Sequence, residues 1–222
     1  MAATNHSLQF RQLRNGASEV IRKLKRIPEF KSAKITIIGG LAVWNYLPNH
    51  RDTQVKKDVD FLVQLEDGFH IRLSELPSGA PELFKSALSV HYPGQFEQLV
   101  NEFRFLPPAR PRTTIPIDFT PAKLSPYVPN QAGRVIQADP NRLPFIGPLD
   151  LAIFKINCCG ARRELSKTIR DVGDVEELVR LLFHQGLIVL SPEQTKIVKE
   201  RLPDVLPYSN FPEAWWRRAL GI

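Results

Sequence analysis

Apolar positions along the chain switch between helical spacing and strand alternation, which predicts an α/β order. Leu13, Ala17, Val20, Ile21 and Leu24 recur at the spacing of one face of an amphipathic helix, which we expect to end near residue 27. The same reading predicts strands at 34–38, 59–64 and 113–117, and helices at 41–47 and 81–90.

From residue 96 onward, the sequence pattern predicts one ambiguous stretch, then an irregular connection and then helices. Residues 96–106 have apolar positions at helical spacing, but Phe103–Phe105 alternates like a strand, so we expect a helix turning into a strand. Residues 120–148 are rich in Pro and Gly and predict an irregular connection with a short strand at 134–137. Three helices and a short end piece are then expected near 149–163, 171–185, 192–201 and 214–218.

These elements divide the chain into three segments. Residues 1–29 form a basic amphipathic helix, residues 30–147 a core built on a mixed β-sheet flanked by helices, and residues 148–222 a C-terminal helical subdomain. The predicted fold class is therefore α/β (α+β). Trp215 and Trp216 predict a tail that docks by burying aromatic surface, and stacking on a nucleic-acid base is the alternative.

Composition is that of a globular protein with an excess of positive charge. The 222 residues are 43% hydrophobic, carry a formal net charge of +7 and give a pI near 9.6. Residues 1–29 hold six basic and two acidic side chains, whereas residues 148–222 hold eleven and ten. Basic charge favours anionic partners without choosing among them. We favour a solvated basic face on a docking helix over a dedicated RNA-binding surface.

Several classes of protein are not indicated. No run approaches the roughly 18 apolar residues that a membrane-spanning helix needs, and no secretory signal is apparent, so we expect a soluble, cytoplasmic protein without a membrane partner. Cys158 and Cys159 are adjacent, which favours core packing over a disulfide or a zinc site. The five histidines show no metal-ligand spacing.

Three aspartates stand out on the predicted strands. Asp58 and Asp60 flank Val59, so both project to one face of a strand with apolar residues at Val59, Phe61, Leu62 and Val63. Asp118 follows the β-branched run, with Ile115 and Ile117 on the face opposite it. Neighbouring carboxylates repel one another unless a cation compensates them, and Mg²⁺ prefers such oxygen ligands. Asp58, Asp60 and Asp118 thus form a candidate two-metal site for phosphoryl transfer.

Gly39 and Gly40 end the predicted strand at 34–38 and precede the predicted helix at 41–47. Residues without Cβ let the backbone approach a phosphate closely. The start of the following helix would also direct free N–H groups and a positive dipole end toward an anion.

Gly39-Gly40, the seventeen residues that follow, Asp58-Val59-Asp60 and the later Asp118 resemble the signature of the nucleotidyltransferase superfamily with the DNA polymerase β-like catalytic fold. Within it, the chain is most similar to AbiEii-type toxins and related small nucleotidyltransferases. Asp150 to Lys155, Arg162, Arg170-Asp171 and Asp174 resemble the helical half of that family.

The resemblance implies a magnesium-dependent enzyme that binds an NTP such as ATP. Asp58, Asp60 and Asp118 would be catalytic and hold two Mg²⁺ ions, with Mn²⁺ as a substitute. Nucleotide-binding residues would be Gly39, Gly40, Arg51, Thr53, Lys155 and Arg162, although the link from Arg51 to Asp58 is longer than usual in that family. The acceptor would be an RNA 3′ end, a protein hydroxyl or a small molecule. The alternative is a catalytically inactive nucleotide-binding or interaction module of the same fold.

Overall fold

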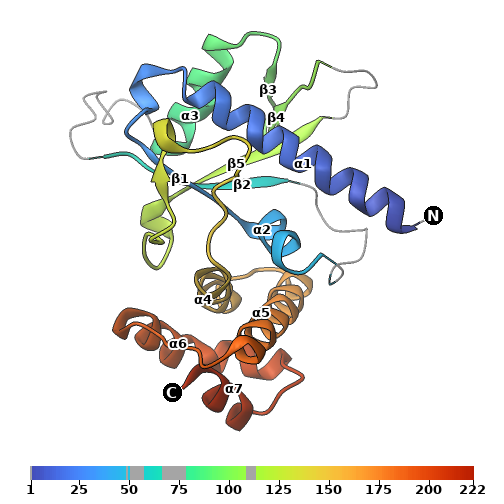
Figure 1. The fold of residues 1–222 in the computed structure, drawn as a ribbon, viewed down its shortest axis with the longest axis vertical. Helices are drawn as coiled ribbons and strands as arrows, with labels where there is room; N and C mark the ends of the chain where they lie inside the picture. The colour runs from blue at the N-terminus through green and yellow to red at the C-terminus, as the bar shows by residue number, and fades with distance from the viewer. Residues whose placement is uncertain (1, 49, 51–57, 67–78, 109–113) are drawn as a thin grey trace. The chain divides into compact units, whose positions relative to one another are not determined.

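The computed structural model describes residues 2–48, 50, 58–66, 79–108 and 114–222, with side chains from residue 8 onward (Figure 1). The chain forms two compact units. Unit 1 comprises Met1–Trp44 and Asp52–Ile146, and unit 2 comprises Asn45–Arg51 and Gly147–Ile222. The boundary after Trp44 lies within a helix, and the boundary after Ile146 lies at the end of the irregular connection.

Unit 1 is a six-stranded mixed sheet in the order β3-β4-β5-β2-β1-β6 (Figure 1). Strands β2 and β5 are parallel, and the other neighbouring pairs are antiparallel. The strands are β1 (Lys34–Ile38), β2 (Val59–Gln64), β3 (Phe96–Gln98), β4 (Phe103–Phe105), β5 (Ile115–Pro121) and β6 (Gly133–Arg134). The strands predicted at 34–38 and 59–64 are confirmed with the same bounds.

Helices α1 (Ala2–Leu24) and α3 (Ala80–His91) contribute to the core on one face of this sheet. The predicted apolar face of the first helix is confirmed, since Ala17, Val20, Ile21 and Leu24 are fully buried. They share that core with Phe61 and the other residues of β2 that point toward α1. The segment 1–29, which we expected as a separate element, is therefore part of unit 1.

Two predictions for unit 1 were wrong in detail. Residues 96–106 form the antiparallel pair of β3 and β4 rather than a helix turning into a strand. Phe96 and Phe103 stack across this pair with 5.4 Å between ring centroids, while Val100 in the connecting turn is 96% exposed. Residues 133–134 form β6, and the predicted strand at 134–137 continues instead as a 3₁₀ turn, Val135–Gln137.

Unit 2 is helical, with α4 (Pro148–Cys159), α5 (Leu165–Gln185), α6 (Pro192–Val205) and α7 (Glu213–Leu220). Short 3₁₀ turns lie at Pro28–Phe30 and Ala122–Leu124 in unit 1 and at Leu206–Tyr208 in unit 2. Helix α6 begins with a capping box in which Ser191 and Gln194 exchange side-chain-to-backbone hydrogen bonds. The sequence placed the start of α5 six residues too late.

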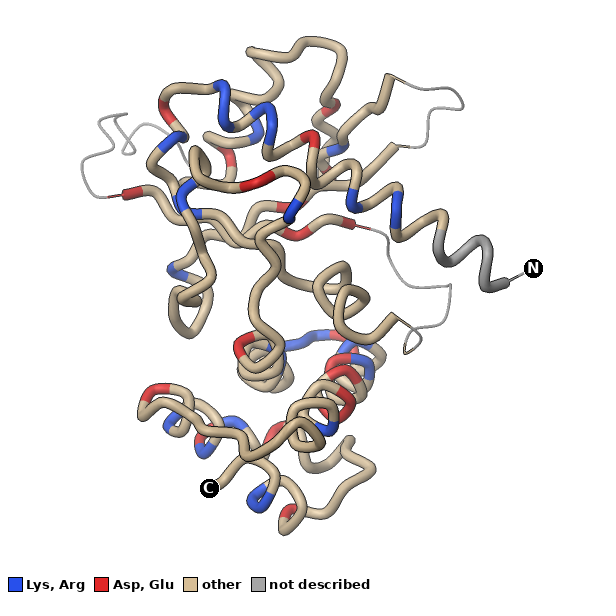
Figure 2. The backbone as a smooth tube through the Cα atoms, viewed as in Figure 1, with Lys and Arg blue, Asp and Glu red and all other residues tan. Residues whose placement is uncertain are grey.

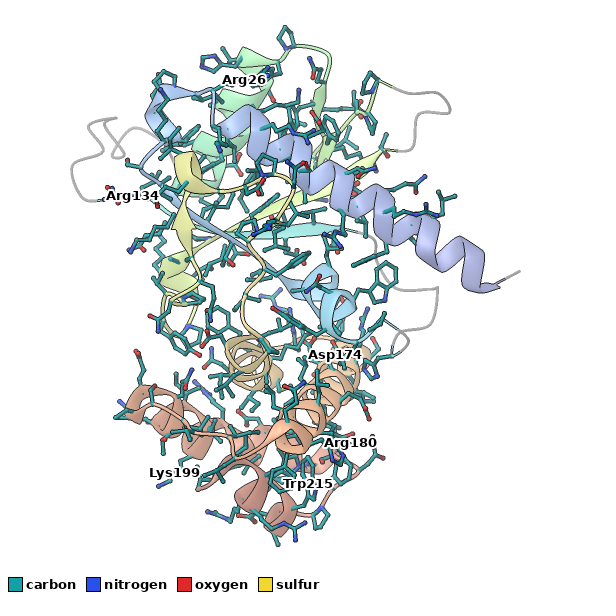
Figure 3. The ribbon with its side chains drawn as sticks, in the orientation of Figure 1. Arg26, Arg134, Asp174, Arg180, Lys199 and Trp215 are labelled. Carbon is teal, nitrogen blue, oxygen red and sulfur yellow. The ribbon has the colours of Figure 1, made fainter. Side chains whose placement is uncertain are left out.

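The C-terminal tail docks through its aromatic residues, as predicted. Trp216 is fully buried, and its indole Nε1 donates to Ser209 Oγ at 2.9 Å. Trp215, labelled in Figure 3, stacks on Phe211 with ring centroids 4.1 Å apart. Cys159 is buried, and neither cysteine forms a disulfide. Among the described residues, no helix has the length and apolar character needed to cross a bilayer.

Candidate active site

Helix α2 (Gly39–Tyr46) follows β1 directly, and its first residue, Gly39, has φ +68°. Side chains other than hydrogen are strained in this left-handed region. A Cβ at Gly39 would also lie 1.9 Å from Asp60 Oδ2 and 2.7 Å from Asp60 Cγ. Both the backbone angle and the space therefore require glycine, because the Asp60 carboxylate occupies the place of the missing side chain at the start of α2.

Strand register places Asp60 beside Asp118 on the parallel strands β2 and β5. Ile38, the residue before Gly39, is the antiparallel partner of Asp60 on the other side. Residues paired across strands share a face of the sheet, so these three positions form a row directly before the glycine turn. The alternate positions Val59, Phe61, Ile117 and Phe119 are buried on the α1 face. The predicted separation of carboxylates from core residues is confirmed.

Asp58 precedes β2 by one residue and is partly buried, and Asp118 is exposed. Asp118 Oδ1 accepts a hydrogen bond from the backbone N–H of Phe119 at 2.9 Å. Within the part of the chain that the structure describes, no group of three His, Cys, Asp or Glu side chains is close enough to hold a metal ion. The donor chemistry and the strand register suit Mg²⁺, but the carboxylates must reorient to ligate it together.

Unit 2 contains a buried cluster of charged side chains centred on Lys155 of α4. Lys155 Nζ lies 2.5 Å from Asp171 Oδ1 and 2.8 Å from Asp174 Oδ2, both on α5. Arg162 Nε donates to the second Asp171 oxygen at 2.8 Å, and His50 Nε2 lies 3.2 Å from Asp174 Oδ1. Asp174, labelled in Figure 3, is fully buried. Because a buried carboxylate is costly without a partner cation, its burial depends on the basic side chains beside it.

Burial and carboxylate charge act in opposite directions on Arg162. Burial alone would lower the pKa of this guanidinium, but the charge of Asp171 and its hydrogen bond outweigh burial and raise the pKa. Arg162 is therefore firmly held as a cation. For Lys155, two of its three N–H donors have carboxylate partners among the described residues, so one donor remains for a further acceptor.

The predicted site residues fall into two groups. Gly39, Gly40, Asp58, Asp60 and Asp118 belong to unit 1, whereas Lys155 and Arg162 belong to unit 2. Arg51 and Thr53 lie outside the described residues. The spacing of the histidines gave no reason to single out His50, and no pattern in the sequence signals its contact with Asp174, 124 positions later in the chain.

Comparisons with known proteins agree with this fold. No protein-family model and no curated protein matches the sequence. A solved structure does match, the crystal structure of an antigenic nucleotidyltransferase-like protein from Paracoccidioides brasiliensis. The match has a TM-score of 0.59 at 14% sequence identity and covers 94% of this chain and 92% of that one. The chain has a nucleotidyltransferase-like fold.

Proposed function

We propose that this protein is a metal-dependent nucleotidyltransferase. It would transfer a nucleoside monophosphate from an NTP to a hydroxyl acceptor and release pyrophosphate. The observation that carries the proposal is the contact between Gly39 and Asp60, which joins a tight glycine turn, a helix start and a carboxylate at one point. Asp118 lies beside that point in the strand register, and the nucleotidyltransferase-like fold supports the same chemistry.

Asp58, Asp60 and Asp118 are the residues that would hold two Mg²⁺ ions, or Mn²⁺ in their place. The bound ions would neutralise charge on the phosphates and on the reacting oxygens. Asp118 is exposed, so its carboxylate is accessible to an acceptor hydroxyl and is the candidate to take the proton of that hydroxyl. The acceptor oxygen then bonds to the α-phosphorus as the bond to the pyrophosphate oxygen breaks.

The chain itself offers two kinds of group to the triphosphate. Gly39, Gly40 and the N–H groups of the first turn of α2 are suited to the phosphate oxygens, because the first N–H groups of a helix have no partner within it. Lys155 and Arg162 are proposed as further phosphate contacts, each already held in place by Asp171. Arg51 and Thr53 remain predicted nucleotide contacts.

The test is label transfer from an NTP labelled at the α-phosphate. The protein is incubated with Mg²⁺ and each of the four NTPs, with total RNA or the protein itself as acceptor. We expect transfer by the wild type, none after EDTA, and a loss of at least 100-fold in Asp58→Asn/Asp60→Asn. Asp139→Asn is the control, because Asp139 is exposed and its Oδ1 accepts a turn hydrogen bond from Asn141 N, which an amide oxygen can also accept.

Transfer that survives Asp58→Asn/Asp60→Asn would disprove the assigned site. A thermal shift measured in parallel separates catalysis from binding, since a ligand that binds only the native state raises the melting temperature. Stabilisation by Mg²⁺ and NTP without transfer to any acceptor would favour the inactive nucleotide-binding module of the same fold.

A further inference from the structure

A polar cleft of about 460 Å³ lies in unit 1 between α1 and residues 140–143 of the irregular connection. Its lining includes Arg14, Asn15, Ser18 and Arg22 of α1, together with Asn141 and Leu143. The carboxylate row points to the other face of the sheet, because α1 packs on the face that carries Phe61. The cleft is therefore separate from the candidate active site.

The cleft has a fixed shape. Arg22 donates to Asn141 Oδ1 at 3.3 Å, and Lys25 Nζ donates to the carbonyl of Ala138 at 2.7 Å, which ties the turn to the helix. On the other side of this turn, the backbone carbonyl of Pro144 accepts from both Thr36 Oγ1 and Ile37 N of β1. Both walls are thus anchored to regular secondary structure, so a ligand would meet a preformed surface.

Positive charge surrounds this cleft. Arg14 and Arg22 line the cleft together with the acidic Glu19. Lys25, bonded to the carbonyl of Ala138, and the Asp139–Arg142 bridge belong to the same turn outside the lining. Figure 2 shows Lys and Arg positions repeated along α1. Glu19 pairs with Arg22 at 2.5 Å, so it offsets one of these cations. The balance remains positive, which suits a ligand with repeated negative charge.

Arg14, which lines the cleft, is held between two aromatic rings that lie outside its lining. Its guanidinium carbon lies 5.6 Å from the ring centroid of Phe10 and 5.9 Å from that of Phe145. These described contacts of Arg14 are with rings rather than with a carboxylate, so its N–H groups are suited to a phosphate. Both rings are only partly buried. Planar guanidinium and aromatic faces beside basic side chains are what proteins use to stack unpaired bases while binding the backbone.

We propose that this cleft binds a single-stranded nucleic acid, with Arg14 and the N–H groups of Arg22 that Glu19 and Asn141 do not use on phosphates, and with Asn15, Ser18 and Asn141 as polar contacts to sugar or base. A lipid surface is disfavoured because the groups lie in a concave site and not on a protruding apolar face. The proposal does not depend on nucleotidyl transfer. It assigns a macromolecular partner to the α1 face of unit 1.

The test measures fluorescence anisotropy of labelled 20-nucleotide RNA and DNA single strands of mixed sequence, in EDTA without NTP. Full-length wild type is compared with Arg14→Gln/Arg22→Gln at several KCl concentrations. We expect the double variant to bind on the order of tenfold more weakly at 0.1 M KCl. The slope of log K against log salt should fall by about 1.4, because each lost phosphate contact on a single strand contributes about 0.7.

Two further variants keep the result interpretable. Lys196→Gln/Lys199→Gln removes two exposed cations from α6 and should leave binding within twofold of wild type. Arg14→Lys/Arg22→Lys retains the charge and should retain the salt slope while losing affinity through weaker stacking. Equal losses in the α1 and α6 glutamine variants would overturn the proposal, because they would indicate general charge attraction.

Other outcomes also count against the cleft. Wild-type affinity in a folded Arg14→Gln/Arg22→Gln variant, checked by circular dichroism, would contradict the proposal directly. Binding to vesicles containing one-third anionic lipid, with no binding to either strand, would assign the surface to membranes instead. Binding that depends on Arg14 and Arg22 supports the cleft even if label transfer fails, so the failure of this proposal and that of the proposed function can be told apart.

Discussion

Gly39 is the residue at which backbone conformation and candidate chemistry meet. Its φ of +68° requires freedom from a Cβ, and the Asp60 carboxylate fills the space that a Cβ would take. Most glycines at positive φ satisfy only the first condition. Gly94, for example, has φ +75° with nothing within 4 Å of a built Cβ. Comparing Gly39 with Gly94 therefore separates the effect of backbone conformation on stability from the effect of steric crowding.

Gly39→Ala should lower the free energy of unfolding by about 1–2 kcal/mol from the left-handed conformation, and by a further amount of similar size from the clash with Asp60. Gly94→Ala should show only the loss that comes from the left-handed conformation. Urea unfolding followed by circular dichroism measures both. Equal losses in the two variants would show that Asp60 does not crowd Gly39. We also expect NTP stabilisation to be lost in Gly39→Ala and retained in Gly94→Ala.

Lys155 is the residue on which the buried charges of unit 2 depend. Lys155→Met should cost about 3–5 kcal/mol of unfolding free energy, because it leaves Asp171 and Asp174 buried with less compensation. Arg162→Met removes a cation whose side chain is 41% exposed and should cost about 1 kcal/mol. Chemical denaturation at pH 7 compares them. A loss below about 1 kcal/mol in Lys155→Met would contradict a structural role for this cluster.

Among the secondary-structure elements, β3 and β4 show how a short apolar stretch can mislead. Val100 and Phe103 are three residues apart and would share a face of a helix. In the structure Phe103 is 2% exposed, whereas Val100 is 96% exposed in the turn. Pairing with β5 decides the outcome, since Phe103 is the partner of Ile117. The β3–β4 hairpin is thus placed by the pairing of β4 with a strand outside the hairpin.

The buried Phe103 and the exposed Val100 should respond differently to alanine substitution. Phe103→Ala should cost about 3–5 kcal/mol, because it removes a buried ring that stacks on Phe96. Val100→Ala should change stability by less than about 0.5 kcal/mol. Thermal melts of the two variants provide the measurement. Similar losses in both would support the helix predicted from the sequence and not the hairpin.

In the molecule as a whole, charge and burial are distributed unequally between the two units. Unit 1 has 18 basic and 13 acidic residues, and unit 2 has 12 and 10. Unit 1 therefore holds most of the excess positive charge, together with the candidate active site and the α1 cleft. Unit 2 holds the buried ion pairs and both cysteines.

Cys159 offers a reporter for the opening of unit 2. Burial, followed by the negative charge of Asp171, raises the pKa of its thiol to about 12. At pH 8 the reactive thiolate is then about one part in 10⁴, and alkylation should be roughly 1,000-fold slower than for a free cysteine. Unit 2 should lose stability as pH rises above about 8.5, where the unfolded thiol ionises and the folded thiol does not.

Alkylation of intact protein, followed by mass spectrometry over a range of urea concentrations, checks this expectation. Cys158→Ser leaves Cys159 as the only thiol and removes ambiguity in the assignment. Modification of Cys159 should accelerate together with the loss of helical circular dichroism. Rapid modification of native Cys158→Ser at pH 8 would contradict the buried, protonated state.

The sequence by itself determined the elements whose signal is local. Strand alternation gave β1 and β2 to the residue, and helical periodicity identified the buried face of α1, because period and burial are linked within each element. It also selected Gly39, Asp58, Asp60 and Asp118 as candidates. The bounds of β1 and β2 were therefore available without any knowledge of pairing, whereas the strand predicted at 113–117 is observed at Ile115–Pro121.

Only the tertiary structure decided which of these residues meet. The parallel register of β2 and β5 sets Asp60 beside Asp118, and the position of Asp60 explains why residue 39 must be glycine. The same holds for His50 with Asp174, for the pairing of β4 with β5 and for the cleft beside α1. Each depends on contacts between residues far apart in the chain, and periodicity carries no information about register or distance across such contacts.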